Sequence, residues 1–311
     1  IQNDLKNNIQ TPACESCWKN ESMGSRSNRR NIEKYENFKS AHIKFSNVCN
    51  FKCRMCGPRL SSAIGIEQKV KNPIVSTFSN PKIKKYFYTK LLPNLHRIYI
   101  SGGEPFLSED HLEFLQIAYK IAPRVKLNYN SNMSVTSYKG VDFRNLWEKY
   151  YRVSIQASID GYEESQEYQR SGSVWKKIAL NTIYFKKYIK EIHCTVTIYN
   201  IFHIPKLIKW CIDNDFKISF YFVDQLWLNP CILPESEKQK IFNEFDHLNN
   251  LEKDMSIEIT DLLLKPLQKS PGNLQELNVY FKKYTKKLDN LRKTQSFTEI
   301  NPQFKDWYER I

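Results

Sequence analysis

The sequence has the composition of a globular protein and a strongly basic charge balance over its 311 residues. Hydrophobic residues make up 41% and charged residues 26%, which excludes a disordered, collagen-like or wholly coiled-coil chain. Lys and Arg total 47 against 33 Asp and Glu, and the net charge of +14 can attract nucleic acid or an acidic partner. No apolar stretch approaches the roughly 20 residues of a membrane helix, so we expect no membrane insertion and a cytoplasmic location. The chain begins with Ile rather than Met, which leaves a preceding segment open.

Short β-branched segments alternate with amphipathic segments from residue 41 to residue 225. This alternation predicts βαβ units, and therefore a parallel sheet in a partial (β/α)6 barrel that is similar to a TIM barrel. Ser108 is the predicted N-cap of one of the helices. The predicted strands are 42–48, 97–101, 126–130, 152–159, 192–199 and 217–223. The predicted helices are about ten residues from 58, then 108–122, 143–150, 174–190 and 204–214.

The segments on either side of residues 41–225 differ from them in composition and pattern. Residues 1–40 are polar and contain a CxxC pair, which predicts an N-terminal arm outside the sheet. Residues 226–311 begin with a loop-like stretch and continue rich in Lys and Leu, which predicts a mostly helical C-terminal extension. We therefore expect three parts, with the barrel over 41–225 between the arm and the extension.

Three cysteines, Cys49, Cys53 and Cys56, lie within eight residues directly after the first predicted strand. Barrels bind their ligands in loops at the carboxyl ends of the strands. Three soft thiolates suit an iron–sulfur cluster or zinc, but a structural zinc site needs four ligands and this loop supplies three. The spacing therefore favours a four-iron cluster with one iron left open. Cys194 and Cys211 fall within a predicted strand and a predicted helix and are expected to be core thiols.

The run CNFKCRMC resembles the CxxxCxxC signature of the radical S-adenosylmethionine (SAM) enzymes. Further segments follow in the order of that superfamily, namely SGGEP, NSNMS, SIDG with QRSGSVW, and TVTIYN. The SIDG and R.G elements are similar to those of its peptide-modifying and sulfatase-maturing members. One departure is Met133, which stands where the family's TNG turn has glycine.

The resemblance implies a role for each matching position. Cys49, Cys53 and Cys56 would hold a [4Fe–4S] cluster. The Gly-Gly-Glu segment would hold the amino group of SAM, and Ser158 and Arg170 would contact its carboxylate. Asn200 would lie near the ribose or the adenine. The predicted cofactor-binding residues are Gly102, Gly103, Glu104, Ser131, Asn132, Ser158, Arg170 and Asn200.

The resemblance also implies a reaction, in which SAM is cleaved reductively to a 5′-deoxyadenosyl radical that abstracts hydrogen from a substrate. An external electron donor such as a flavodoxin or a ferredoxin would then be a partner. The SIDG likeness favours a peptide or protein substrate. The alternatives are a nucleotide, a sugar or another small metabolite, and RNA, which is supported only by the basic charge of the chain. A non-enzymatic alternative is an RNA-binding module that uses its cysteines for a structural metal.

A second cysteine pair, Cys14 and Cys17, lies in the predicted arm. Its segment resembles the opening of a group of twitch-type radical SAM proteins, and twitch regions carry auxiliary clusters. Two cysteines cannot complete a cluster, so further ligands would have to come from elsewhere, for example from Cys231. A second iron–sulfur cluster, another metal or redox site, and an unmetallated pair all stay open.

Overall fold

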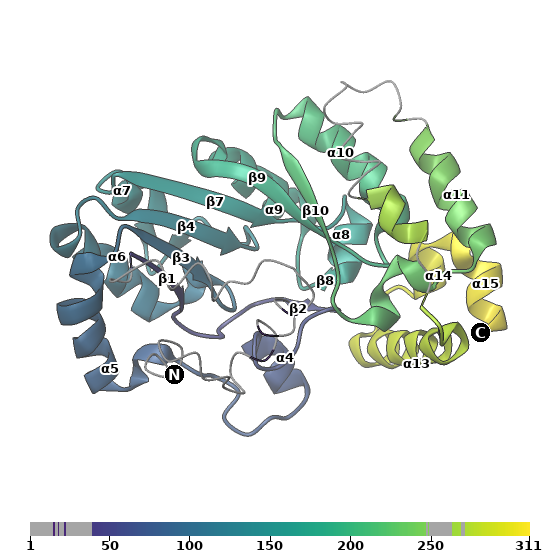
Figure 1. Ribbon diagram of the computed structural model, residues 1–311, viewed down its shortest axis with the longest axis horizontal. Coiled ribbons are helices and arrows are strands. Elements are labelled where there is room, and N and C mark those ends of the chain that lie inside the picture. The colour runs from purple at the N-terminus through teal and green to yellow at the C-terminus, as the bar shows by residue number, and fades with distance from the viewer. Residues whose placement is uncertain are drawn as a thin grey trace.

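The six predicted strands form one sheet in which every neighbouring pair is parallel. The computed structural model describes residues 39–246, 248, 263–268 and 271–311, together with Glu15, Trp18 and Ser22, so Cys14 and Cys17 of the predicted arm lie outside the described residues. The strand order β1-β3-β4-β7-β9-β10 follows the chain, and β1 and β10 remain as the two edges (Figure 1). The predicted partial barrel is therefore confirmed. No helix of the described residues is long and apolar enough to cross a membrane.

The bounds of the elements are as follows. The sheet contains β1 Ser40–Lys44, β3 Arg97–Ser101, β4 Lys126–Ser131, β7 Arg152–Ser158, β9 Ile189–Val196 and β10 Ile218–Phe222. Two small antiparallel pairs join β2 Lys52–Cys53 to β8 Arg170–Ser171, and β5 Ser137–Tyr138 to β6 Val141–Asp142. The helices of the barrel are α4 Ser62–Glu67, α5 Pro81–Tyr86, α6 Glu109–Ile121, α7 Phe143–Trp147, α8 Glu164–Gln169, α9 Trp175–Tyr184 and α10 Ile204–Asp213. Short 3₁₀ or π turns are η2 Thr77–Ser79, η3 Phe87–Leu91, η4 Leu92–Asn94, η5 Pro105–Leu107, η6 Lys186–Tyr188, η7 Ile201–His203, η8 Leu226–Leu228, η9 Pro230–Ile232, η11 Lys265–Gln268 and η12 Pro302–Phe304.

Three expected helices and the first strand have different bounds in the structure. The strand predicted at 42–48 is Ser40–Lys44, and the helix predicted at 143–150 ends at Trp147. The helix predicted over 174–190 ends at Tyr184, because η6 follows and Ile189 already begins β9. The helix expected from residue 58 starts only at Ser62, where the Ser61 side chain accepts a hydrogen bond from the Ile64 backbone N–H. Helices α5 and α8 were not predicted. Ser108 is confirmed as an N-cap, since its Oγ accepts from the backbone N–H of His111.

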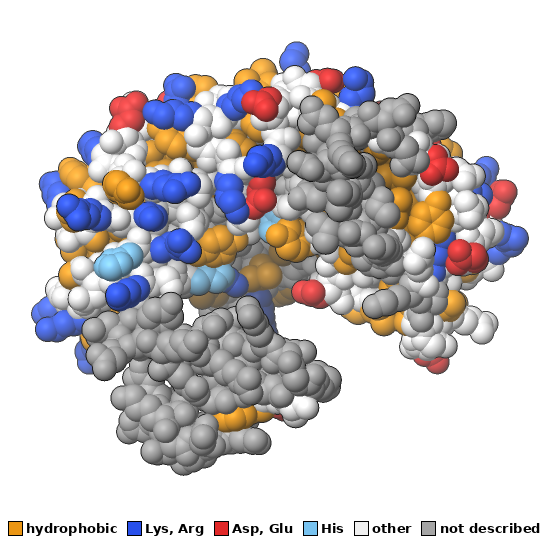
Figure 2. Space-filling model, turned by 45° about the horizontal axis from the view of Figure 1, so that its top comes forward, with side chains coloured by type: hydrophobic (Ala, Val, Ile, Leu, Met, Phe, Trp, Pro, Cys, Tyr) orange, Lys and Arg blue, Asp and Glu red, His pale blue; other side chains and the backbone are white. Residues whose placement is uncertain are grey.

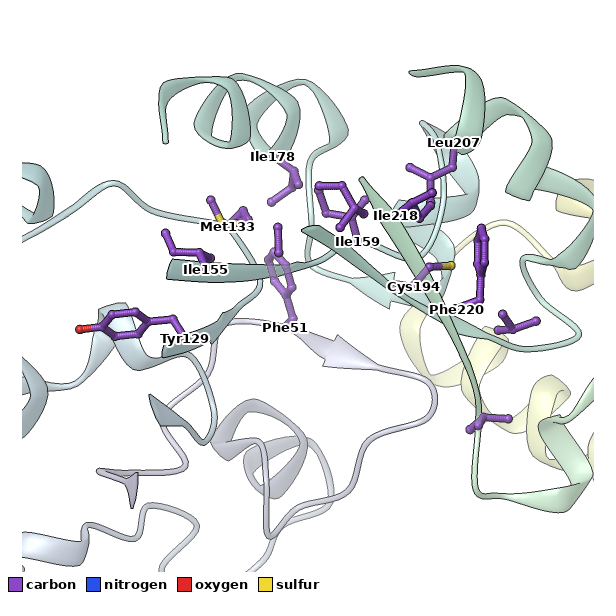
Figure 3. Packing of buried hydrophobic residues seen from close by; sticks show 14 of the residues in the cluster. Phe51, Tyr129, Met133, Ile155, Ile159, Ile178, Cys194, Leu207, Ile218 and Phe220 are labelled. Atoms are coloured by element: carbon purple, nitrogen blue, oxygen red, sulfur yellow. The ribbon is translucent and has the colours of Figure 1, made fainter. Parts of the chain in front are cut away.

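The main core lies between the sheet and the helices on its outer side. Alternate strand residues such as Ile98, Leu127 and Ile155 are fully buried. Figure 3 shows Ile178 of α9 and Leu207 of α10 on the side of the sheet that carries this core. Each such aliphatic side chain contributes about 1.5–3 kcal/mol by its burial. The other residues of the core include the thiols of Cys194 and Cys211, as predicted.

The opposite, inner face of the sheet is polar. Side chains alternate along a strand, so the residues between the core positions share this face. Ser154 donates from Oγ to Asn128 Oδ1 at 2.8 Å, and Gln156 donates from Nε2 to Glu191 Oε1 at 2.6 Å. The Tyr99 hydroxyl donates to Gln156 at 3.3 Å. This face offers hydrogen-bonding groups to a ligand inside the partial barrel.

The C-terminal extension is helical over its described residues, as predicted. Its helices are α11 Glu235–Asp246, α13 Leu274–Arg292, α14 Phe297–Ile300 and α15 Lys305–Arg310. Ser296 and Glu299 form a capping box that starts α14. Figure 1 shows α13 beside β2, near α4. The extension therefore reaches the segment that contains the three cysteines.

Candidate functional site

The cysteine loop, residues 49–56, follows β1 at the carboxyl end of the sheet. Its middle pairs with β8, so that Cys53 lies opposite Arg170. The backbone N–H of Cys49 donates to Ser62 Oγ at 3.1 Å, and the N–H of Cys56 donates to the Cys53 carbonyl at 3.0 Å. All three cysteines are partly buried and free of disulfides. The fold thus brings the predicted cluster ligands and the predicted Arg170 to one place.

Gly102 and Gly103 pack directly against the chain that enters the cysteine loop. The N–H of Gly103 donates to the Ser46 carbonyl at 3.1 Å, and the N–H of Glu104 donates to the Val48 carbonyl at 2.7 Å. A Cβ at position 103 would lie 2.1 Å from the Val48 oxygen, and Gly102 has a φ of +137°. A side chain at position 103 would clash with the Val48 oxygen, and a φ of +137° at position 102 is accessible mainly to glycine. The two glycines therefore position the backbone that leads to Cys49.

Glu104 is a carboxylate that is 1% exposed beside this turn. It accepts hydrogen bonds from Ser131 Oγ at 2.9 Å, from the Asn132 N–H at 2.6 Å and from the Phe106 N–H at 3.1 Å. Burial raises the pKa of Glu104 to about 7, although these donors favour the ionised form. No Lys or Arg of the described chain forms an ion pair with it. A buried carboxylate with donors but no cation suits the ammonium group of a ligand.

Asn132 connects Glu104 to the cysteine loop. Its Nδ2 donates to Asn50 Oδ1 at 3.1 Å and lies 3.9 Å from Cys49 Sγ. The next residue, Met133, is fully buried with a φ of +59°, a left-handed conformation that costs a non-glycine residue roughly 1–2 kcal/mol. This backbone conformation explains why glycine suits the position. Ser131 and Asn132 thus lie between Glu104 and the cysteine loop, and their part in binding SAM stays a prediction.

Arg170 forms a buried bidentate ion pair with Asp160. Its Nε and Nη2 donate to the two carboxylate oxygens at 2.6 and 2.9 Å. Burial disfavours the charged guanidinium, but Asp160 more than offsets this and raises the pKa of Arg170. The remaining Nη1 lies 3.8 Å from Cys53 Sγ. Asp160, which belongs to the SIDG segment, was not predicted as a site residue, and a contact between Arg170 and SAM stays a prediction.

Ser158 and Asn200 occupy different environments at this end of the sheet. Ser158 ends β7, is partly buried and pairs in register with His193. Asn200 is fully buried, and its Nδ2 donates to the carbonyls of Asp160 and Thr195 at 2.6 and 2.9 Å. Because both amide hydrogens are used, Asn200 holds the ends of β7 and β9 together. Its predicted approach to the ribose or adenine remains untested, as does the predicted role of Ser158.

Burial shifts the pKa of all three thiols in the cysteine loop. Burial raises the pKa of Cys49 to about 11 and of Cys53 to about 12, and it also raises the pKa of Cys56. The thiolate forms that bind metal therefore need the positive charge of the metal itself. Among the described residues, no three His, Cys, Asp or Glu side chains converge to hold one metal ion. Three thiolates at separate positions suit a [4Fe–4S] cluster, in which each binds a different iron.

A buried arginine of the cysteine loop is held by the C-terminal extension. Arg54 is fully buried, and its Nη2 donates to Asp289 Oδ1 of α13 at 2.6 Å. Its Nε donates to the Tyr168 carbonyl at 2.8 Å, and its guanidinium lies 3.6 Å from the centre of the Tyr168 ring. The Tyr284 hydroxyl, also from α13, donates to the Arg54 carbonyl at 2.6 Å. Sequence reasoning missed this contact because 235 positions separate Arg54 and Asp289 and no local pattern links them.

A second ion pair joins the end of α13 to α4. Arg292 donates from Nε and Nη2 to the two carboxylate oxygens of Glu67 at 3.1 and 2.9 Å. Its Nη1 donates to Ser171 Oγ of β8 at 3.2 Å, and Lys52 of β2 also pairs with Glu67 at 2.9 Å. Helix α13 therefore contacts α4, β8 and the cysteine loop.

The family model that matches part of this chain agrees with the candidate site. Residues 41–183 match the family model described as a 4Fe-4S single cluster domain. No curated protein matches the chain. The solved structure of Streptococcus suis SuiB bound to precursor peptide SuiA is similar at a TM-score of 0.42 and 15% identity, over 70% of this chain and 55% of that one. The solved structure of Streptococcus suis SuiB bound to S-adenosylmethionine is similar at a TM-score of 0.44 and 15% identity, over 80% of this chain and 58% of that one. The chain thus spans little more than half the length of these solved chains.

The matched segment contains the cysteine loop, the Gly-Gly-Glu turn, the Ser131–Asn132 pair and the Asp160–Arg170 pair. These are the residues that the structure brings together at the carboxyl end of the sheet. The match to a 4Fe-4S cluster domain agrees with the predicted iron–sulfur cluster, and the roles of the individual residues are tested by the experiments below.

Proposed function

We propose that this chain is a radical SAM enzyme, which cleaves SAM with a [4Fe–4S] cluster held by Cys49, Cys53 and Cys56. One observation carries the proposal. The loop with the three cysteines lies beside Glu104, a buried carboxylate without a cationic partner among the described residues, and beside the guanidinium of Arg170. When bound, the cluster and SAM supply a 5′-deoxyadenosyl radical that removes hydrogen from a substrate.

The chain's own residues bind and orient the cofactor in this proposal. Glu104 receives the ammonium group of SAM, and Ser131 and Asn132 hold the carboxylate of Glu104 in place. Arg170 offers Nη1 to the carboxylate group, since Asp160 occupies its other side. Each charge-assisted hydrogen bond of this kind contributes roughly 1.5–3 kcal/mol. Burial of both charged groups keeps water away from them and strengthens the interactions.

The proposed substrate is a peptide or a protein. The likeness of the SIDG and R.G segments to peptide-modifying members supports this class. The polar inner face of the sheet supports it further, because a peptide backbone needs hydrogen-bond partners along its length. An external donor such as a flavodoxin or a ferredoxin would supply the electron.

Anaerobic reconstitution tests the proposal. Wild-type protein should bind about four irons in its main cluster and form 5′-deoxyadenosine from SAM after reduction with dithionite. Cys49→Ala, Cys53→Ala and Cys56→Ala should each lower the rate at least 100-fold. The control is Cys211→Ala, which removes a core thiol and should retain the rate. Formation of 5′-deoxyadenosine at the wild-type rate in any of the three variants would refute the assignment, and so would a colourless wild-type protein that takes up zinc instead.

A further inference from the structure

Three cations stand side by side at the amino ends of neighbouring strands. Arg97 of β3 is in register with Lys126 of β4, which is in register with Arg152 of β7. Neighbouring strands lie about 4.7–4.9 Å apart, and residues in register on parallel strands point to the same face. Like charges placed opposite each other destabilise a sheet. In the part of the chain that the structure describes, no carboxylate forms an ion pair with any of the three.

These cations line a cavity of about 470 Å³ on the polar inner face. Lys187 and Lys190 extend its basic lining, and no Asp or Glu is among the described residues that line it. The lysines have other contacts: Lys126 and Lys187 approach the rings of Tyr151 and Tyr188, and Lys190 pairs with Glu191 at 3.2 Å. Figure 2 shows many Lys and Arg side chains on the half of the molecule that carries these strands. The cavity therefore has a surplus of positive charge, to which the two arginines contribute most directly.

The cavity and the cysteine loop lie at opposite ends of the same strands. On β4, Lys126 lines the cavity, whereas Ser131 bonds to Glu104 in the site. Strand β4 has 6 residues, and at about 3.3 Å per residue its ends are about 16 Å apart. The polar side chains of Asn128 and Gln156 lie on the inner face and also line the cavity. An extended peptide of about five residues would span the distance between the two ends.

We propose that this cavity binds the carboxylates of an acidic segment in the peptide substrate, about five residues from the residue that is modified. The inference rests on the proposed function and adds a substrate class to it. A guanidinium binds a carboxylate through two parallel hydrogen bonds, which suits Arg97 and Arg152. An anion between them also removes the repulsion within the row. The cavity admits a few side chains, so an extended segment fits it and a folded domain does not.

Binding of a labelled acidic peptide tests the proposal. Fluorescence anisotropy of fluorescein-labelled hexaglutamate is measured on the full chain without SAM or reductant, with hexaglutamine as the neutral probe. Wild type should bind hexaglutamate and not hexaglutamine. Arg97→Gln/Arg152→Gln should weaken binding at least tenfold and reduce its salt dependence. Lys82→Gln/Lys85→Gln removes the same charge from exposed positions of α5 that do not line the cavity, and should weaken binding less than twofold. Equal losses in the two double variants would overturn the proposal.

Thermal unfolding supplies a second readout that does not depend on the label. Hexaglutamate should raise the Tm of wild type and leave that of Arg97→Gln/Arg152→Gln unchanged. The Tm of this variant alone should not be lower than that of wild type, because the substitution removes like-charge repulsion. An equal rise of Tm in both proteins would contradict the cavity as the binding site.

Hexauridylate is the competing probe. If it binds more tightly than hexaglutamate and depends on the same two arginines, the acidic peptide is wrong and the cavity binds RNA. Weaker binding of hexauridylate supports the peptide. The binding assays contain no SAM, so a failure of SAM cleavage would refute the proposed function alone. Likewise, a failure of hexaglutamate to bind in the cavity would refute the anion site alone and not the proposed cleavage of SAM.

Discussion

Glu104 is the residue whose environment is hardest to explain without a ligand. Three donors surround its carboxylate, yet it is buried, and burial raises its pKa to about 7. A carboxyl group with a raised pKa destabilises the folded protein when it ionises. This loss of folding stability begins as the pH rises above the ordinary Glu pKa of about 4.3, and it continues to grow until the pH exceeds about 7. A bound ammonium group would offset the cost, because it pairs with the ionised form.

We therefore expect the affinity of the cluster-loaded protein for SAM to fall as the pH drops below about 7, by up to tenfold per pH unit. Glu104→Gln should bind SAM roughly 10- to 100-fold more weakly at pH 8, because a charge-assisted hydrogen bond is lost. Its affinity should be flat between pH 6 and pH 8. Equilibrium binding isotherms measure both effects, with iron content at each pH as the control. Parallel pH profiles of wild type and variant would show that another group titrates.

At the scale of elements, α13 joins the C-terminal extension to the site. Asp289 is the counter-ion of Arg54, and Tyr284 bonds to the carbonyl of the same residue. Arg54 stands directly after Cys53, so these contacts hold the backbone between two of the proposed cluster ligands. Removing one partner of a buried pair costs about 3–5 kcal/mol, because the other charge stays buried.

Asp289→Asn should therefore loosen the cysteine loop as well as lower the Tm. We expect reconstituted protein to lose at least half of its iron during gel filtration, and the electron paramagnetic resonance spectrum of the reduced cluster to broaden. Asp306→Asn, an exposed position on α15, is the matched control and should change neither. If Asp289→Asn keeps all its iron and the wild-type spectrum at a temperature where it is folded, α13 does not position the cluster.

For the whole molecule, the open question is the number of clusters. Cys14 and Cys17 lie outside the described residues, and their role stays a prediction. Cys231, considered as a further ligand, is partly buried in η9, where burial raises the pKa of its thiol. The substrate class proposed for the basic cavity is likewise a property of the whole molecule, because it depends on both ends of the sheet.

Cys14→Ala/Cys17→Ala should remove iron beyond the roughly four atoms of the main cluster. It should still form 5′-deoxyadenosine without substrate, since the three ligands of the main cluster lie in another segment. Mössbauer spectroscopy of the wild type and the double variant counts the clusters. A single cluster in the wild type would mean that the pair holds zinc or is a plain dithiol.

The features that could be predicted from the sequence are those that depend on neighbouring residues. The strand predicted at 97–101 has the same bounds in the structure, because an alternating β-branched run encodes a strand locally. The cysteine loop and the Gly-Gly-Glu turn were recognisable because their ligands and glycines lie within a few positions. The prediction of a helix up to residue 190 was wrong, because strand pairing in the sheet overrides the local helical pattern there. The amphipathic pattern continues past Tyr184, but Ile189 pairs with Ile155 in the sheet.

Contacts between groups that are distant in the sequence became known only from the folded structure. The Arg54–Asp289 pair joins positions that no periodicity relates, and its strength comes from burial, which exists only after folding. The row of Arg97, Lys126 and Arg152 depends on strand register, which is set when the whole sheet packs against its helices. The charge of each residue was visible in the sequence. Their repulsion, and the anion that would relieve it, follow from the few ångströms between neighbouring strands.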